Sequence, residues 1–358
     1  MTLLPEITLL APARAQTLKM PFVTRRVPRG VMATLLGGER QPRPGDLVLV
    51  RVERLGQHRH LELVSGRRSR LFAGDEVVLA YGHRYAPDQF EAEVPDHLGP
   101  CHMVAAGGIA SCMLSRHGRV RAATQVQPLG LIGDRQGQVI NLADHALPAP
   151  PAVRRRPFTV AVLGTSMNAG KTETVSHLVR GLAASGLRVG AAKVTGTGSG
   201  GDVWSMTDAG ARQVLDFTDA GMASTYLADT AQLAAAQQRL IDTLAAQGND
   251  AVVFEVADGL LQRETGLLAS SPAFADMVDA VVFAAGDAMG AAMGVGWLRQ
   301  RGLPVRAASG LMTASPLAAR EAAAATGLPV LDLAALSDVG VADVLGWVAV
   351  PNQAGVAG

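Results

Sequence analysis

The chain has 358 residues, of which 48% are hydrophobic and 18% are charged, and its formal net charge is +1. This length is sufficient for two domains with separate cores. A net charge close to zero argues against a surface for nucleic acid or for an anionic membrane. Two cysteines, Cys101 and Cys112, do not make a disulfide scaffold, and the start of the chain lacks the pattern of a secretory signal. We therefore expect a cytoplasmic protein that binds neither nucleic acid nor membranes.

Residues 1–145 are predicted to form a β-rich domain. Apolar runs at 46–52 and 75–81 each follow a glycine typical of a turn, and polar and apolar residues alternate over 60–64. Short strands punctuated by Gly, Pro and Asp are typical of a small barrel or a sandwich. The pattern at 109–115 predicts one helix in this domain.

A Pro-rich and basic segment, ALPAPPAVRRRP, occupies residues 146–157. This composition is typical of a linker, so we place the domain boundary there. The second domain is then predicted to span residues 158–350. The remaining residues, 351–358, have the composition of a frayed tail.

Residues 158–172 read FTVAVLGTSMNAGKT and contain the most informative motif of the chain. The apolar run 158–163 is typical of a buried strand, the residues after it fit G-x-x-x-x-G-K-[ST], and a helical pattern follows. In such a loop, backbone N–H groups at a helix N-terminus bind phosphate, the lysine reaches the β- and γ-phosphates, and the threonine binds Mg²⁺. The predicted nucleotide-binding residues are Gly164, Thr165, Ser166, Met167, Asn168, Ala169, Gly170, Lys171 and Thr172.

Strands and helices are predicted to alternate through the second domain. The expected strands are 158–163, 188–194, 251–256, 279–285, 304–309 and a short one at 329–333, and the expected helices are 171–184, 205–214, 230–246, 288–301 and 315–326. This alternation is typical of an α/β fold in which helices cover both faces of a parallel sheet. Together with the phosphate-binding loop, it predicts a P-loop NTPase whose ligands bind at the C-terminal ends of the strands.

Charged residues follow two of the predicted strands. Lys193 ends an apolar strand, and the glycine-rich run after it leads to Asp202, a candidate Mg²⁺ ligand, with Asp208 as the alternative. Glu255 ends another buried strand, where a second metal carboxylate is expected, and Asp258 follows it closely. Phosphoryl transfer needs metal ligands and a stabilising charge beside the P-loop. We expect the glycine-rich run to allow the close approach of a ligand.

Several segments, in the same order, resemble the dethiobiotin synthetase-like family of P-loop enzymes, which includes the glutamine-dependent cobyrinic acid amidating enzymes. The matching segments are GTSMNAGKT, AAKVTGTG, FEVADG and the run that begins DAVVFAAGD, and they cover about residues 158–335. Two positions depart from the family pattern: Ser166 stands where the family has Asp, and Gly does not follow Glu255. A more distant similarity links the chain to P-loop D-amino-acid N-acyltransferases.

The resemblance implies a role for each matching position. The lysine and threonine of the P-loop are implied at phosphate and Mg²⁺, and Thr165 is implied near the substrate end of the loop. Lys193 is implied at the activated carboxylate or carbamate of the substrate. The predicted catalytic residues are Lys171, Lys193 and Thr165, and the predicted metal ligands are Thr172, Asp202 and Glu255.

These features predict a Mg²⁺-dependent enzyme that uses ATP or GTP. The favoured hypothesis is a ligase or synthetase that phosphorylates a carboxylate or carbamate of a small molecule before an amide or similar bond forms. One alternative is a regulatory or metallochaperone NTPase, in which hydrolysis switches a loop. Another is an N-acyltransferase whose P-loop holds the phosphates of an acyl-CoA. We expect a carboxylate-bearing small molecule as the partner, and a homodimer.

Overall fold

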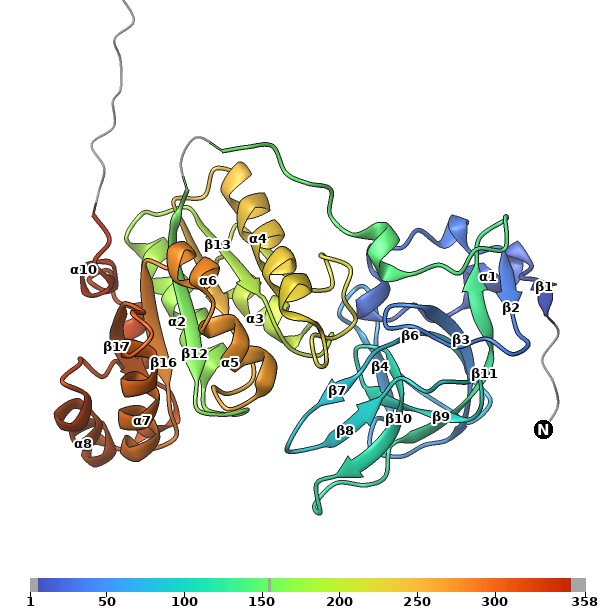
Figure 1. Ribbon diagram of the computed structural model, residues 1–358, viewed down its shortest axis with the longest axis horizontal. Helices are drawn as coiled ribbons and strands as arrows, with labels where there is room; N and C mark the ends of the chain where they lie inside the picture. Colours follow the sequence, from blue (N-terminus) through green and yellow to red (C-terminus); the bar gives the residue numbers. More distant parts are fainter. Residues whose placement is uncertain (1–5, 154–155, 349–358) are drawn as a thin grey trace, which may run out of the picture.

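Two domains lie side by side in the computed structural model, which describes residues 6–153 and 156–348 (Figure 1). The first domain, coloured blue to green, is rich in strands. In the second domain, coloured green to red, strands and helices alternate. The predicted tail, 351–358, lies outside the described residues.

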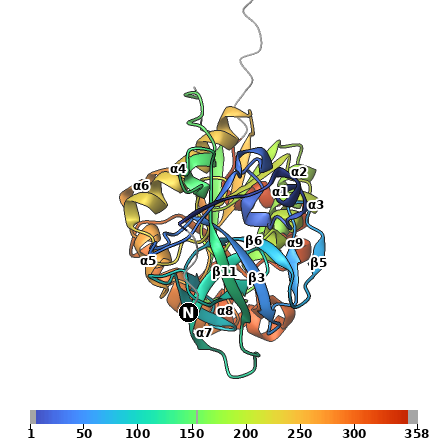
Figure 2. The same cartoon turned by 90° about the vertical axis from the view of Figure 1, so that its right-hand side faces the viewer.

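A closed ring of paired strands forms the first domain. β3 (Leu47–Arg54) pairs with β6 (Glu76–Tyr81) and β11 (Thr124–Gly133), β6 pairs with β10 (Ile109–Arg116), and β9 (Cys101–Ala105) pairs with both β10 and β11. Because the last pairing returns to β11, the sheet closes into a barrel. Figure 2, seen from this side, shows β3, β6 and β11 in front of the second domain. The predicted β-rich fold is thus confirmed, in the form of a barrel.

The barrel strands have apolar side chains on both of their faces. Leu47 and Leu49 of β3 pack into one apolar cluster, whereas Val48 and Val50 pack into another, as the alternation of a strand requires. The other elements of this domain are β1 (Ile7–Leu9), α1 (Pro12–Thr17), η1 (Phe22–Thr24), η2 (Arg29–Val31), β2 (Thr34–Leu36), β4 (His60–Glu62), β5 (Arg68–Arg70), β7 (Arg84–Tyr85), β8 (Phe90–Glu93) and η3 (Leu142–His145).

The helix predicted at 109–115 is wrong, because these residues belong to strand β10. A turn at Gly107 and Gly108, with φ of +105° at Gly108, joins β9 to β10 and leads into their antiparallel pairing. β10 also pairs with β6 and β8, so its backbone N–H and C=O groups have partners along both edges. This pairing outweighs the local helical pattern.

Parallel strands form the sheet of the second domain in the order β14-β13-β15-β12-β16-β17. Their bounds are Phe158–Gly164 for β12, Val189–Lys193 for β13, Gln213–Asp216 for β14, Ala251–Glu255 for β15, Ala280–Ala284 for β16 and Val305–Ser309 for β17. All of these except β14 match predicted strands. β14 lies where the end of the helix 205–214 is predicted, because Gly210, at φ of +103°, follows an earlier helix end. The strand predicted at 329–333 is reduced to a bridge between Val330 and Ala308.

Helices cover both faces of this sheet. Val252 and Phe254 of β15 face one layer, and Ala251 and Val253 face the other. The first layer contains α4 (Thr230–Ala246), α5 (Arg263–Ala269), α6 (Pro272–Met277), α7 (Ala288–Arg299) and α8 (Pro316–Thr326), and the second contains α2 (Lys171–Ala184), α3 (Gly201–Asp208), α9 (Leu333–Ser337) and α10 (Val341–Leu345). The predicted α/β class, a P-loop NTPase fold with a parallel sheet between helices, is confirmed.

The segment 146–157 connects the domains, and its described residues form neither helix nor strand. Leu147 N–H donates to Asp219 O at 2.7 Å. At the other end, Arg156 Nη2 lies 2.6 Å from Asp279 Oδ1. Both ends of the linker are therefore held by the second domain, while Arg154 and Arg155 lie outside the described residues.

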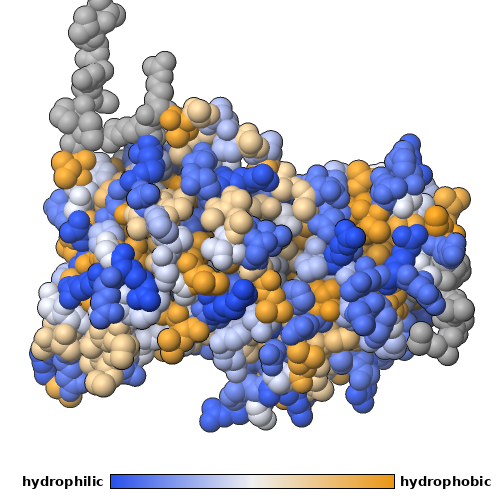
Figure 3. Space-filling model, in the orientation of Figure 1, coloured by the Kyte–Doolittle hydropathy of each residue, from blue (hydrophilic) through white to orange (hydrophobic). Residues whose placement is uncertain are grey.

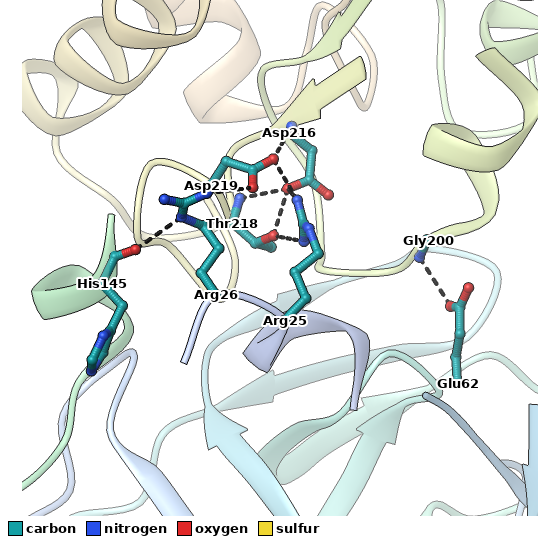
Figure 4. Close-up of polar contacts among 8 residues, drawn as sticks. All are labelled: Arg25, Arg26, Glu62, His145, Gly200, Asp216, Thr218 and Asp219. Atoms are coloured by element: carbon teal, nitrogen blue, oxygen red, sulfur yellow. Dashed lines mark hydrogen bonds and ion pairs between the residues drawn. The ribbon is translucent and has the colours of Figure 1, made fainter. Parts of the chain in front are cut away.

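Arg25, which follows η1 of the barrel, inserts between two carboxylates of the second domain (Figure 4). Its Nη2 lies 2.8 Å from Asp216 Oδ1 and 2.5 Å from Asp219 Oδ2, and its Nη1 donates to the Thr218 hydroxyl. The Asp216 and Asp219 side chains are 1% and 7% exposed. Because two neighbouring carboxylates without water require a cation, this contact fixes how the domains dock.

We expect Arg25→Ala to lower the free energy of unfolding by about 3–5 kcal/mol, because it leaves Asp216 buried without a cation and leaves Asp219 only the more distant Arg26, at 3.9 Å. Arg14→Ala is the control: Arg14 also pairs with a carboxylate, Glu76, but its side chain is 40% exposed, so the loss should not exceed about 1 kcal/mol. Urea unfolding followed by circular dichroism measures both. Equal losses would show that the Arg25 contact does not hold the interface.

Candidate nucleotide site and interdomain pocket

The predicted phosphate-binding loop lies between β12 and α2. The loop ends at Gly170, whose φ of +94° favours glycine, and α2 begins at Lys171. Lys171 Nζ donates to Ser166 O at 2.7 Å, so the ammonium lies over the loop. The first N–H groups of a helix have no acceptor within it, and the helix dipole adds positive potential there. The loop therefore has the chemistry of a phosphate site, as its sequence predicts.

Small residues bring other segments against this loop. A Cβ on Gly170 would lie 3.0 Å from Gly310 Cα, and a Cβ on Gly259 would lie 2.2 Å from Thr165 O. On its other side, Thr165 contacts the start of α7, because a Cβ on Gly290 would lie 2.9 Å from Thr165 Cγ2. The loop is therefore held from both sides, and Thr165 lies between the segment after β15 and the start of α7.

Four of the predicted site residues meet at the C-terminal ends of β13 and β15. The Thr172 hydroxyl lies 3.1 Å from Asp202 Oδ1 and 3.0 Å from Glu255 Oε2. Lys193 Nζ donates to Asp202 Oδ2 and lies 3.8 Å from Glu255 Oε1. Asp208 is at the far end of α3 and is exposed, so the structure places Asp202, and not Asp208, beside the P-loop threonine.

Burial and mutual attraction set the charges of this cluster. Burial raises the pKa of Glu255, despite its neighbouring lysines. Burial opposes the charge on Lys193, but Asp202 and Glu255 outweigh it and raise the pKa of Lys193. Burial lowers the pKa of Lys171. The net effect favours the charged forms of Lys193 and Asp202, whereas burial disfavours the charged forms of Glu255 and Lys171.

The cluster fits Mg²⁺ together with a nucleotide. Its Thr172 hydroxyl lies between two carboxylates, and hydroxyl and carboxylate oxygens are ligands that Mg²⁺ accepts. Over the described ranges, His, Cys, Asp and Glu side chains do not gather in threes as a metal site. A cation here would therefore complete its shell with water and nucleotide phosphate, as Mg²⁺ does at P-loops.

A pocket of about 450 Å³ opens between this cluster and the barrel. From the second domain it is lined by Met167 of the P-loop, by Lys193 and Asp202, and by Asp258, whose pKa is raised by burial. Its barrel wall includes His58, Arg59, Arg68, Arg84 and Tyr85. We refer to this cavity as the interdomain pocket. The sequence did not predict its barrel wall, although the arginines at 67–70 are one signal for it.

The glycine-rich run after Lys193 packs against the barrel. A Cβ on Gly107 of the barrel would lie 2.0 Å from Gly198 O, and a Cβ on Gly198 would lie 2.3 Å from Val23 Cγ1. A Cβ on Gly200 would lie 2.5 Å from Glu62 Oε1. We expected these glycines to allow the close approach of a ligand. In the structure, it is the barrel domain that lies close to them.

Glu62, at the end of β4, holds this run through hydrogen bonds (Figure 4). Its carboxylate accepts from Gly200 N at 2.9 Å, from Ser199 Oγ at 3.2 Å and from Trp204 Nε1 at 3.1 Å. Glu62 is 5% exposed. Because Asp202 follows directly, a barrel residue positions the segment that carries a predicted metal ligand.

The outer surface is mixed in hydropathy. Figure 3 shows hydrophobic and hydrophilic residues interspersed over one face of both domains. Of the helices in the described ranges, none is long and apolar enough to cross a membrane.

Comparisons with known proteins do not identify a family. The sequence matches neither a protein-family model nor a curated protein. Among solved structures it is similar to the signal recognition particle receptor FtsY of Elizabethkingia anophelis in complex with GDP, with 15% identity, a TM-score of 0.36, and coverage of 52% of this chain and 60% of that one. It is also similar to the 54 kDa signal recognition particle protein of Aeropyrum pernix in complex with GDP. The identity is 22%, the TM-score is 0.37, and the match covers 55% of this chain and 47% of that one.

The kinase domain of the Escherichia coli tyrosine kinase ETK is a further similar structure. Its identity is 14%, its TM-score is 0.33, and the match covers 44% of this chain and 68% of that domain. TM-scores of this size do not establish a shared fold. The fold assignment therefore rests on the parallel sheet and the loop between β12 and α2.

We expect Glu62→Gln to loosen the run 199–204, because an amide offers one acceptor oxygen where three donors now meet a carboxylate. Hydrogen bonds to a charged group contribute about 1.5–3 kcal/mol, so amide hydrogen exchange at Gly200 should accelerate about tenfold or more. Glu76→Gln, which changes a carboxylate that pairs with Arg14, is the control and should leave this exchange unchanged. Unchanged exchange in Glu62→Gln would show that Glu62 does not hold the run.

Proposed function

We propose that this protein is a Mg²⁺- and NTP-dependent enzyme of the ligase or synthetase type. It phosphorylates a carboxylate or carbamate of a small molecule bound in the interdomain pocket. The observation that supports this most is the cluster of Thr172, Asp202, Glu255 and Lys193, which joins the P-loop to that pocket.

Each residue of the cluster has a distinct role in this proposal. The P-loop N–H groups and Lys171 bind the nucleotide phosphates. Thr172, Asp202 and Glu255 would hold Mg²⁺, which neutralises charge on the transferred phosphoryl group. Lys193 lies 14% exposed at the pocket wall, where its ammonium can orient the acceptor carboxylate.

Asp258 favours a second candidate, an N-acyltransferase. It lines the interdomain pocket, and burial raises its pKa. Such a carboxylate can accept the proton that an amine loses when it attacks a thioester. In this case the P-loop would bind the phosphates of an acyl-CoA. Binding of acetyl-CoA without Mg²⁺-dependent hydrolysis of ATP or GTP would favour this candidate over the first.

Nucleotide binding should depend on Lys171. We expect Lys171→Ala to weaken ATP or GTP binding by about 1.5–3 kcal/mol, which is roughly tenfold or more, because a charge-assisted contact to phosphate is lost. Isothermal titration with Mg²⁺ present measures this. Lys19→Ala, which removes a barrel lysine paired with Asp75, should bind nucleotide normally. Unchanged affinity in Lys171→Ala would exclude the loop as a nucleotide site.

Lys193 should act on turnover rather than on nucleotide affinity. We expect Lys193→Ala to change ATP or GTP affinity by only a few-fold and to reduce strongly the phosphate release that a panel of small carboxylates stimulates, because contacts made in the transition state act on rate. Lys193→Arg should not restore the rate, since a planar guanidinium has a different reach and geometry. Loss of nucleotide affinity as large as in Lys171→Ala would assign Lys193 to the phosphate site instead.

A further inference from the structure

Arg84 is a buried cation in the barrel wall of the interdomain pocket. It begins the short strand β7, and it is 7% exposed. Its Nη2 donates to Gln89 Oε1 at 3.1 Å. Its Nε has no hydrogen-bond partner within the described part of the chain. A buried donor without a partner is unusual in a folded protein.

The charge of Arg84 is also left without an ion pair. Asp88 and Asp258 attract it, but among the described residues no carboxylate oxygen lies within 4.0 Å of its nitrogens. Burial lowers the pKa of Arg84 to about 10, so the guanidinium still carries its charge at neutral pH. Of these two carboxylates, Asp88 accepts from Asn168 Nδ2 through Oδ2 at 3.0 Å, and its Oδ1 has no hydrogen-bond partner among the described residues. An anion in the pocket would compensate the charge of Arg84 at short range.

The other groups of the pocket also favour an anion at this wall. Arg59 and Arg68 line it from the barrel. His58 contributes no positive charge at neutral pH, because burial lowers its pKa to about 4. On the opposite wall, the charge of Lys193 is matched by Asp202. The barrel side is therefore the more positive wall of the interdomain pocket.

We propose that Arg84 binds a carboxylate of the small molecule that occupies the interdomain pocket, through its terminal nitrogens. The planar fork of a guanidinium matches a carboxylate in two hydrogen bonds. The bound group is a second anionic group, distinct from the one that Lys193 orients. The proposal rests on the proposed function for the identity of the reacting group, and the barrel domain supplies the selectivity for the substrate.

Binding of a simple dicarboxylate tests this without turnover. We expect succinate to raise the melting temperature of the full chain, and Arg84→Gln to weaken succinate binding about tenfold or more. Succinamate, in which one carboxylate is an amide, should stabilise less. Arg51→Gln, which removes an exposed barrel arginine that lies near Glu76 and outside the pocket lining, is the control and should bind succinate normally. Nucleotide binding should be unaffected in Arg84→Gln, which separates this test from the test of the proposed function.

The free protein gives a second readout that needs no ligand. A buried cation whose partner is a ligand destabilises the ligand-free protein. We therefore expect Arg84→Gln to melt at the same or a higher temperature than the natural chain. If Arg84 had a purely structural role, its substitution should lower the melting temperature, as we expect for the substitution of Arg25. A lower melting temperature together with unchanged succinate binding would overturn the proposal. Failure of succinate to stabilise the natural chain, or stabilisation through Arg84 by phosphate alone, would overturn the assignment to a carboxylate.

Discussion

The run between Lys193 and Asp202 lies between the two domains, and its hydrogen bonds to Glu62 connect the barrel to the phosphate-binding sheet. Lys193 ends β13 and Asp202 lies in the first turn of α3, so the run sets the distance between these two side chains. Backbone contact at Gly107 and Gly198 leaves no room for a side chain at either position. The geometry of the candidate site therefore depends on how the barrel docks.

Charged groups account for much of this docking. Arg25 compensates Asp216 and Asp219, and Glu62 accepts from donors at the start of α3. Replacing such buried polar contacts by apolar ones is often neutral for stability, but an apolar interface could adopt several registers. Hydrogen bonds and ion pairs are directional, so they favour a single arrangement of the two domains. That arrangement places Arg84 and Lys193, from different domains, in the lining of the same interdomain pocket.

The two domains contribute different chemistry to the pocket. The parallel sheet brings its P-loop, Lys193, Asp202 and Glu255 together because strands that run in the same direction end at the same edge. The barrel contributes arginines and a neutral histidine, whose pKa is lowered by burial. In the proposed function, the sheet domain therefore binds phosphate and the barrel domain recognises the substrate.

The sequence by itself determined the α/β class, the limits of most strands and helices after residue 158, and the residues of the phosphate-binding loop. These are local signals, because strand period, helix period and a glycine-bounded loop lie within a few residues of one another. Lys193 and Glu255 were identified as site residues since each ends an apolar run. The helix predicted at 109–115 failed for the opposite reason, since partners distant in sequence decide strand pairing.

Only the tertiary structure decided the closure of the barrel, the choice of Asp202 over Asp208, and the interdomain pocket. Glu62 and Gly200 are separated by 138 residues, and Arg25 and Asp216 by 191. No local pattern marks such pairs, because an exposed glutamate and a buried one that accepts three hydrogen bonds look alike in a sequence. The same holds for Arg84. Its lack of an ion pair matters only because the residue is buried, since an unpaired polar group is costly only away from water, and the local sequence does not show that burial.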